Sequence, residues 1–276
     1  MNSLLKTIKL IFNKHSDDFF IYEGFQIPIK LMLLTGGGPN NFAEIAKAHI
    51  QNIEKFVGLA SDFSVLEIGC GIGRDAIPLT KHLSGPGTYL GIDIIKQSIT
   101  WCQNNISKKF PNFKFLHFDV KDQLHNPNGI LSMQDVQIPL QSGSVDLILL
   151  QSVFTHLLRS DVLYYLKEFK RLLKPSGRVY ATMFVVNDAI LASARATNLT
   201  AWNLTFEHKV DDGCFINDPL HPTGAVAYTF EEVYRLVNEA GLKLARPLVD
   251  GSWSGYYSNA KDGQDVLILA LPEKES

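Results

Sequence analysis

Three glycines at alternate positions follow a short apolar run in this sequence. Residues 65–68 read VLEI, with Glu67 as their charged member, and Gly69, Gly71 and Gly73 come next. An apolar run of this length that ends in glycines is typical of a buried strand followed by a loop. Glycines let a backbone turn sharply and approach a ligand without clashes from a Cβ atom. The stretch therefore predicts a ligand-binding loop at the carboxyl end of a buried strand.

Short apolar runs alternate with helical patterns from about residue 41 to the end of the chain. Seven runs are typical of strands: 63–69, 88–93, 113–119, 145–150, 178–185, 242–249 and 264–271. Helical spacing separates most of them, which predicts a parallel sheet with helices on both faces. One of these helices is expected over 74–83, and KPSG at 174–177 is expected to be a turn. No helix separates the last two runs, so the final strand is expected to be antiparallel. The fold class is thus a doubly wound α/β sheet of seven strands, mostly parallel.

Two stretches depart from this alternation. Residues 1–40 precede the sheet and are interpreted as an N-terminal cap, and the domain itself is expected over 41–276. Residues 185–228 follow the fifth strand and are far longer than a usual connection, which favours a functional lid insertion. Aromatic residues of this insertion and of the 249–263 loop could stack on an acceptor or simply pack the lid: Trp202, Phe206, Phe215, Tyr228, Trp253, Tyr256 and Tyr257.

The composition argues against several partners. The formal net charge is −2, and residues 185–228 hold five acidic against two basic side chains, so no nucleic-acid partner is expected. Three scattered cysteines do not form a disulfide framework, which favours the cytoplasm. No stretch reaches the about 18 apolar residues of a membrane span. Lysines in residues 1–14 could touch an anionic membrane surface, although a packed helix is the favoured interpretation. The oligomeric state is not indicated.

The glycine pattern separates two nucleotide-binding families. A dinucleotide fingerprint, GxGxxG, would place its third glycine at position 74, where the chain has Arg74. This disfavours a dehydrogenase. The observed pattern, ExGxGxG from Glu67, resembles instead the first motif of class I S-adenosylmethionine-dependent methyltransferases. Asp93 ends the second strand in GIDI, Asp119 ends the third in LHFDV, and SVDLILLQSVFTHL resembles the family's fourth motif.

This resemblance implies a Rossmann-like fold and S-adenosylmethionine as cofactor. Asp93 is expected to accept bonds from the ribose hydroxyls, Asp119 to bind the adenine amine, and Val120 to cover the adenine ring. Gln151 stands where metal-dependent members carry a carboxylate, so no metal is expected. The implied positions of the methyl-donor site are Glu67, Gly69, Cys70, Gly71, Gly73, Arg74, Asp93, Ile94, Asp119, Val120 and Gln151.

The acceptor side is less defined. Holding the nucleophile in line with the methyl group is the main catalytic task, and a general base assists when the acceptor is a hydroxyl. His156, after the fourth strand, is the candidate base, with a packing role as the alternative. SVFTHL also resembles an uncharacterised bacterial group of small-molecule or glycan-tailoring enzymes. We therefore expect metal-independent transfer to a hydroxyl or amine of a small or glycan-like acceptor, with a non-catalytic S-adenosylmethionine-binding protein as the alternative.

Overall fold

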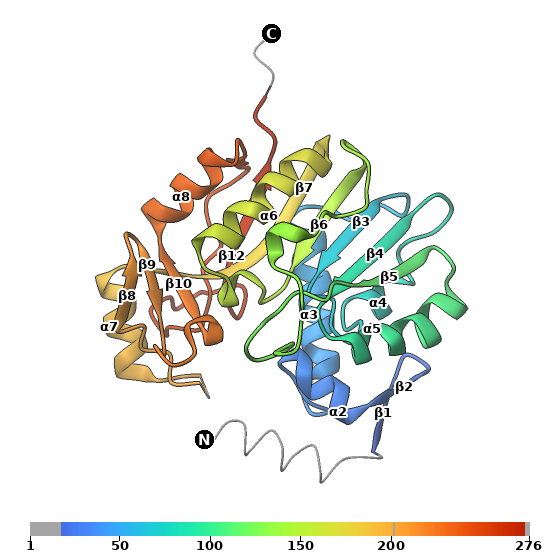
Figure 1. Ribbon diagram of the computed structural model, residues 1–276, viewed down its shortest axis with the longest axis horizontal. Helices are drawn as coiled ribbons and strands as arrows, with labels where there is room; N and C mark the ends of the chain where they lie inside the picture. The colour runs from blue at the N-terminus through green and yellow to red at the C-terminus, as the bar shows by residue number, and fades with distance from the viewer. Residues whose placement is uncertain (1–17, 201, 274–276) are drawn as a thin grey trace.

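A ten-stranded sheet forms the centre of the computed structural model, which describes residues 18–200 and 202–273 (Figure 1). Five strands are parallel, in the order β5-β4-β3-β6-β7. They are β3 (Ser64–Ile68), β4 (Thr88–Asp93), β5 (Phe113–His117), β6 (Val145–Leu150) and β7 (Leu173–Val186). Strand β12 (Asp265–Ala270) pairs antiparallel with β7, and β11 (Lys243–Leu244) pairs with β12. The expected mostly parallel α/β sheet with an antiparallel last strand is confirmed.

Helices cover both faces of this sheet. On one face lie α3 (Phe42–Phe56), α4 (Ala76–Leu79), and α5 (Lys96–Cys102) with its π-helical extension η2 (Gln103–Ser107). On the other lie α6 (Arg159–Leu172) and α8 (Phe230–Glu239). Strand β3 shows why two layers form: Val65 packs on the α3 side, whereas Leu66 and Ile68 pack on the α6 side. Side chains of successive strand residues point to opposite faces.

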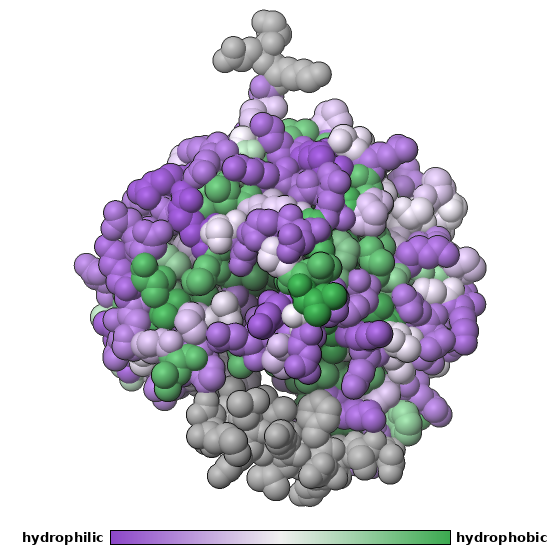
Figure 2. Space-filling view, viewed as in Figure 1, coloured by the Kyte–Doolittle hydropathy of each residue, from purple (hydrophilic) through white to green (hydrophobic). Residues whose placement is uncertain are grey.

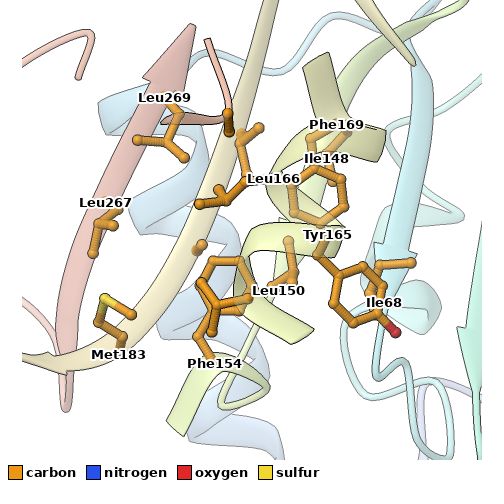
Figure 3. Packing of buried hydrophobic residues seen from close by; sticks show 14 of the residues in the cluster. Ile68, Ile148, Leu150, Phe154, Tyr165, Leu166, Phe169, Met183, Leu267 and Leu269 are labelled. Atoms are coloured by element: carbon orange, nitrogen blue, oxygen red, sulfur yellow. The ribbon is translucent and has the colours of Figure 1, made fainter. Parts of the chain in front are cut away.

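A hydrophobic cluster under α6 supports the segment that follows β6. Figure 3 shows Phe169 and Leu166 of α6 packed against Ile148 of β6, with residues of β7 and β12 beside them. Phe154, in the short helix η4 (Phe154–His156), is fully buried in the same cluster. This packing fixes the segment that follows β6, because η4 is anchored in the core by its first residue.

The N-terminal segment forms a small hairpin before α3. Strands β1 (Phe19–Tyr22) and β2 (Phe25–Pro28) pair antiparallel and lead into α2 (Ile29–Met32) and η1 (Leu33–Thr35). Phe25 and Ile27 are buried in the cluster that also holds α3 residues. The lysines of residues 1–14, with the choice between a packed helix and a membrane contact, lie outside the described residues. Among the described helices, none is long and apolar enough to cross a membrane.

The insertion after β7 is partly continuous with the sheet. It contains α7 (Asp188–Thr197), β8 (His208–Asp211), β9 (Cys214–Ile216) and η5 (Pro222–Gly224), and it ends in β10 (Val226–Thr229). Strand β10 pairs parallel with residues 184–186 of β7, and β9 and β8 follow antiparallel at the edge. The lid and domain boundaries stay predictions, but residues 226–229 extend the sheet.

Two local expectations are wrong. A helix was expected over 74–83, yet α4 spans one turn from Ala76 to Leu79, because Pro78 has no N–H to continue the helical bonds. The KPSG stretch at 174–177 was expected to be a turn, but it lies within β7 as an irregularity, where Leu173 pairs with Val145 and Arg178 already pairs with Leu147.

Candidate methyl-donor and acceptor site

The glycine loop is closely covered by three other segments. Gly69 and Gly71 both have positive φ angles, 74° and 52°, which favour glycine. A Cβ atom on Gly69 would lie 2.4 Å from Cγ2 of Val153, and one on Gly71 would lie 2.2 Å from Cγ2 of Thr35. Gly73, with φ of 78°, faces Ile106 in the same way. The glycine loop is thus covered by the N-terminal segment, by η2 at the end of α5 and by the β6–α6 connection. We call this arrangement the glycine cradle.

Asp93 fastens this loop to the neighbouring strand. Its Oδ2 accepts a hydrogen bond from the Gly71 N–H at 2.7 Å, and its Oδ1 accepts one from the Ile95 N–H at 2.7 Å. Burial raises the pKa of this carboxyl, and the two N–H groups oppose the rise. The predicted ribose-binding carboxylate therefore lies directly against the glycine loop. Ile94, beside it, is half-buried in the hydrophobic core.

Asp119 and Val120 lie just beyond β5. Val120 is buried in the core, and Asp119 is half-buried. The Asn126 side chain donates hydrogen bonds to Asp119 Oδ1 and to the Val120 carbonyl, both at 3.0 Å. Within residues 18–200 and 202–273, no other side chain is hydrogen-bonded to the Asp119 carboxylate. The apolar side chain and the acceptor oxygen that the sequence predicted for adenine are thus adjacent, and Asn126 orients them.

Two buried polar groups at the end of β6 lack partners. Gln151 is 7% exposed, and its Nε2 has no hydrogen bond within the described chain. The Thr155 hydroxyl, in η4, is likewise buried and unbonded in the described part. A buried polar group without a partner carries a free-energy cost, which a ligand or an ordered water removes. Sequence reasoning included Gln151 but missed Thr155, although this residue lies within the SVDLILLQSVFTHL stretch.

The side chains of three predicted site residues contact other parts of the protein. Glu67 accepts a hydrogen bond from the Tyr89 hydroxyl, and burial together with the Asp75 charge raises the pKa of Glu67 to about 8. The Cys70 thiol packs beneath Gly91 in the sheet. Arg74 turns toward the N-terminal segment and donates from Nη1 to the Thr35 carbonyl at 3.0 Å. These side chains shape the loop and its cover, and Cys70 offers a ligand its backbone only.

A buried ion pair supports the glycine loop and was not foreseen. His49 of α3 places its Nδ1 within 3.0 and 2.9 Å of the two Asp75 carboxylate oxygens. Burial alone would raise the pKa of Asp75, but the charge of His49 and its hydrogen bond hold it below its usual value. The pair joins α3 to the residues that follow the glycines, 26 positions away along the chain. No local sequence signal marks such a long-range pair.

His156 lies between two loops at the carboxyl ends of the strands. Its Nδ1 is 3.0 Å from the carbonyl oxygen of Thr223 in η5. A carbonyl oxygen only accepts, so Nδ1 carries the proton and Nε2 of the neutral ring has the lone pair. The ring also meets His125 edge to face, with 5.7 Å between centroids. Burial and the positive charge of His125 lower the pKa of His156. The geometry thus presents a neutral imidazole with a basic nitrogen.

Most of the aromatic residues expected in a lid are packed inside it. Phe206 and Trp253 are buried with Phe184 of β7 in one cluster. Tyr228 is buried and donates its hydroxyl hydrogen to the Leu157 carbonyl. By contrast, 59% of Trp202 and 47% of Tyr256 are exposed. The packing alternative therefore holds for most of this set, and only the exposed side chains are free to stack on an acceptor.

Comparison with known proteins decides the family. A family model described as a methyltransferase domain matches residues 59–241, which is more than half of the chain. The chain belongs to this methyltransferase domain family. S-adenosylmethionine is the cofactor that the family and fold indicate. The residues of this methyltransferase domain fit such a ligand, because they offer a glycine cradle, a carboxylate at Asp93 and an unbonded buried amide at Gln151.

Curated relatives of the chain include tRNA methyltransferases. The chain is 26% identical over 200 residues to the human tRNA N(3)-cytidine methyltransferase METTL2B, covering 71% of this chain and 46% of that protein. It spans about half the length of the curated relatives it matches. The expectation that nucleic acid is excluded as a partner finds no support here. Among the described residues, no group of three or more His, Cys, Asp or Glu could hold a metal ion.

Solved structures agree on the fold. A phosphoethanolamine N-methyltransferase from Haemonchus contortus, in complex with phosphoethanolamine and S-adenosylhomocysteine, has a TM-score of 0.56 at 15% identity, covering 100% of this chain and 51% of that one. A putative S-adenosylmethionine-dependent methyltransferase from Methanococcus maripaludis has a TM-score of 0.54 at 15% identity, covering 89% and 94%. At this identity the likeness shows the shared fold alone.

Replacing Asp93 by asparagine is expected to weaken S-adenosylhomocysteine binding at least tenfold. The asparagine still accepts one N–H bond, so the loop is retained, but charge-assisted bonds to a ribose, worth about 1.5–3 kcal/mol each, are lost. Titration calorimetry measures the affinity, and thermal melting checks the fold. Asp62→Asn, on the surface, is the matched control. Unchanged affinity in a folded Asp93→Asn protein would remove Asp93 from the binding site.

Proposed function

We propose that this chain transfers a methyl group to a hydroxyl or amine of a small or glycan-like acceptor, without a metal. Bound S-adenosylmethionine supplies an electrophilic methyl group on a sulfonium sulfur. The observation that carries the proposal is the link from the Asp93 carboxylate to the Gly71 N–H. This bond joins the carboxylate that is expected to bind the ribose to the backbone of the glycine loop.

The methyl-donor site in this proposal uses residues from three strand ends. Asp93, at the end of β4, binds the ribose; Asp119 and Val120, after β5, bind the adenine; and Gln151, after β6, gives its free amide N–H groups. Ligands of parallel α/β sheets lie beyond the carboxyl ends of the strands. Glu67 and Arg74 act indirectly, since their side chains bond to Tyr89 and to the Thr35 carbonyl. Cys70 takes part through its backbone.

His156 is the proposed general base. Its Nε2 has the lone pair, because Nδ1 is committed to the Thr223 carbonyl. A neutral imidazole whose Nε2 has a lone pair can remove a proton from an acceptor hydroxyl as the methyl group is transferred. The ring is held by η4, whose first residue, Phe154, is buried in the core. The base is therefore positioned by rigid elements of the fold.

A small acceptor is supported by the surface near this end of the sheet. Exposed apolar side chains occur in the β5–β6 connection, as Ile130, and in the insertion, as Leu199 and Leu220. Figure 2 shows hydrophobic side chains gathered across the middle of the same face. The two charged residues at the tip of the β8–β9 hairpin, Asp211 and Asp212, are acidic. Apolar surface with a few polar groups suits an organic molecule better than a phosphate backbone.

Two other functions follow from specific observations. The tRNA-methyltransferase names of the relatives favour an RNA acceptor. If His156 is not a general base, the same methyl-donor site would make the chain a protein that binds S-adenosylmethionine without catalysis. A cytoplasmic location is part of the proposal and is supported by the three free, buried thiols of Cys70, Cys102 and Cys214.

Radiolabelled S-adenosylmethionine separates the three functions. The full chain is incubated with methyl-labelled S-adenosylmethionine and either a small-metabolite and oligosaccharide fraction or total RNA. We expect label in the first fraction only, and none with heat-denatured protein. S-adenosylhomocysteine should raise the melting temperature, whereas NAD and ATP should not, since position 74 is an arginine.

Each other outcome has a distinct meaning. Label in RNA would overturn the acceptor class and leave the cofactor assignment standing. Binding of S-adenosylhomocysteine without label in any fraction would favour the non-catalytic alternative. Absence of binding at millimolar S-adenosylhomocysteine would overturn the proposal as a whole.

A further inference from the structure

A tight loop between β5 and β6 holds a second histidine against His156. Asp122 and Asn126 exchange backbone hydrogen bonds of 3.1 and 3.2 Å, so the chain turns back on itself between them. His125 lies in this turn, and its ring meets the His156 ring at an interplanar angle of 73°. The loop is also anchored near the methyl-donor site by the Asn126 bond to Asp119. Two segments that are 31 positions apart thus place two imidazoles side by side.

The Asp122 carboxylate fixes the orientation of His125. Its Oδ1 accepts the backbone N–H of His125 at 2.7 Å and of Leu124 at 3.0 Å, and it lies 3.0 Å from His125 Nδ1. An ionised carboxylate only accepts, so His125 Nδ1 carries a proton. Nε2 is then free to carry a second one. The contact is therefore an ion pair whenever His125 is doubly protonated.

We propose that Asp122 and His125 form a positioning pair that keeps the neighbouring His156 ring neutral, with Nε2 as its proton acceptor. The catalytic meaning of this pair rests on the proposed function, because it presumes that His156 is the base. The electrostatic relation between the two histidines does not depend on any reaction. It follows from the ring contact, the Asp122 bond and the Thr223 bond, which come from three different segments.

Burial is the largest cause that lowers the pKa of His156, and the charge of His125 lowers it further, whereas the charge of Asp122 and the backbone hydrogen bonds to Thr223 and Gly224 oppose this. Burial lowers the pKa of His125, but the hydrogen bond and charge of Asp122 outweigh it, so the pKa is raised overall. Burial opposes ionisation of Asp122 as well, yet the bonds from His125 lower its pKa to about 2. A cationic His125 then disfavours a second positive charge on His156.

The remaining titratable groups near His156 do not replace this effect. From the insertion, the Thr223 carbonyl faces His156, and His221 lies beside Gly224 in the same segment. On the His156 side, Arg159 begins α6 and is paired with Glu232 and Glu239. Asp93, at the end of β4, acts on His125 and favours its charge. His125 is the titratable residue in ring contact with His156.

The test is a histidine NMR titration of the full chain without ligands. In His125→Gln, which removes the cation, the His156 titration midpoint is expected to move to higher pH. In His125→Lys, which restores a positive charge, it should stay near the wild-type midpoint. His208→Gln, on the exposed strand β8, is the matched control and should leave His156 unchanged. Asp122→Asn keeps both rings, and there the His125 midpoint should move to lower pH.

Kinetics give the second measurement. If the chain transfers methyl groups, His125→Gln should move the acidic limb of the kcat profile to higher pH, with the KM for S-adenosylmethionine unchanged. A purely structural role would lower kcat equally at every pH. The proposal is overturned if His156 titrates as in the wild type in folded His125→Gln, or if His125 titrates unchanged in Asp122→Asn. If no acceptor is found, the NMR titrations still test the Asp122–His125 pair. Failure of this proposal is therefore distinguishable from failure of the proposed function.

Discussion

Replacing Asp265 by alanine is expected to lower the free energy of unfolding by about 3–6 kcal/mol. This carboxylate is 4% exposed and accepts three hydrogen bonds: from the Val185 N–H at 2.9 Å, the Gly251 N–H at 2.8 Å and the Trp253 indole N–H at 2.8 Å. Alanine would leave three buried N–H groups without a partner, each costing about 1–3 kcal/mol. Such a loss is large against the about 5–15 kcal/mol that stabilises a typical domain.

The position of Asp265 explains why the loss is structural. It begins β12, opposite Met183, at the point where β7 passes from its pairing with β12 to its pairing with β10. Chemical denaturation measures the effect, and Asp250→Ala, an exposed carboxylate nearby, is the matched control. An Asp265→Ala protein whose free energy of unfolding falls by less than 1 kcal/mol would show that water replaces the carboxylate.

Replacing His156 by glutamine is expected to lower kcat by about 10²–10⁴-fold, the usual contribution of a general base. The glutamine amide can still donate to the Thr223 carbonyl, so the β6–α6 connection keeps its position, but it accepts no proton from a substrate. Affinity for S-adenosylhomocysteine should be unchanged, because His156 is outside the proposed adenosine contacts. Turnover with the identified acceptor and titration calorimetry provide the two measurements.

The pH dependence of kcat gives a second measure of the role of His156 as a base. Burial and His125 lower the pKa of His156 below the ordinary 6.5, so the ring is neutral and basic at pH 7. Activity should therefore be full above that pKa and fall as the pH drops through it. A wild-type kcat in His156→Gln, with this profile unchanged, would remove His156 from the chemistry.

The sequence was informative where strands are buried and continuous. The runs that became β3, β4, β6 and β12 are predominantly apolar, because strands covered by helices on both faces need no polar side. The glycine loop and Asp93 were located by the same signal, since the loop directly follows one such strand and Asp93 is the last residue of another. Their mutual hydrogen bond could not be read from the sequence, because it depends on the register between β3 and β4.

Other parts of the fold lack a local signal. Strand β8 reads HKVD and is exposed throughout, so its residues carry no alternation toward a core. Strand β10 has four residues and is stabilised by pairing with β7, a contact of long sequence separation. The contact between His125 and His156 likewise joins two loops, and each histidine alone resembles a surface residue. Sequence reasoning found His156 by its place after β6 and missed its partner.

The pairing of β10 with β7 also determines how the insertion can move. Ala227, Tyr228 and Thr229 lie in register with residues 184–186, so a swinging flap would have to break main-chain bonds of the central sheet. Amide protons of β10 should then exchange with solvent only as slowly as global unfolding allows. The insertion belongs to the same cooperative unit as the strands that hold the site. We expect ligands to enter instead past the segment around Thr35, which contacts the glycine loop through the Arg74–Thr35 hydrogen bond and the Thr35 methyl group.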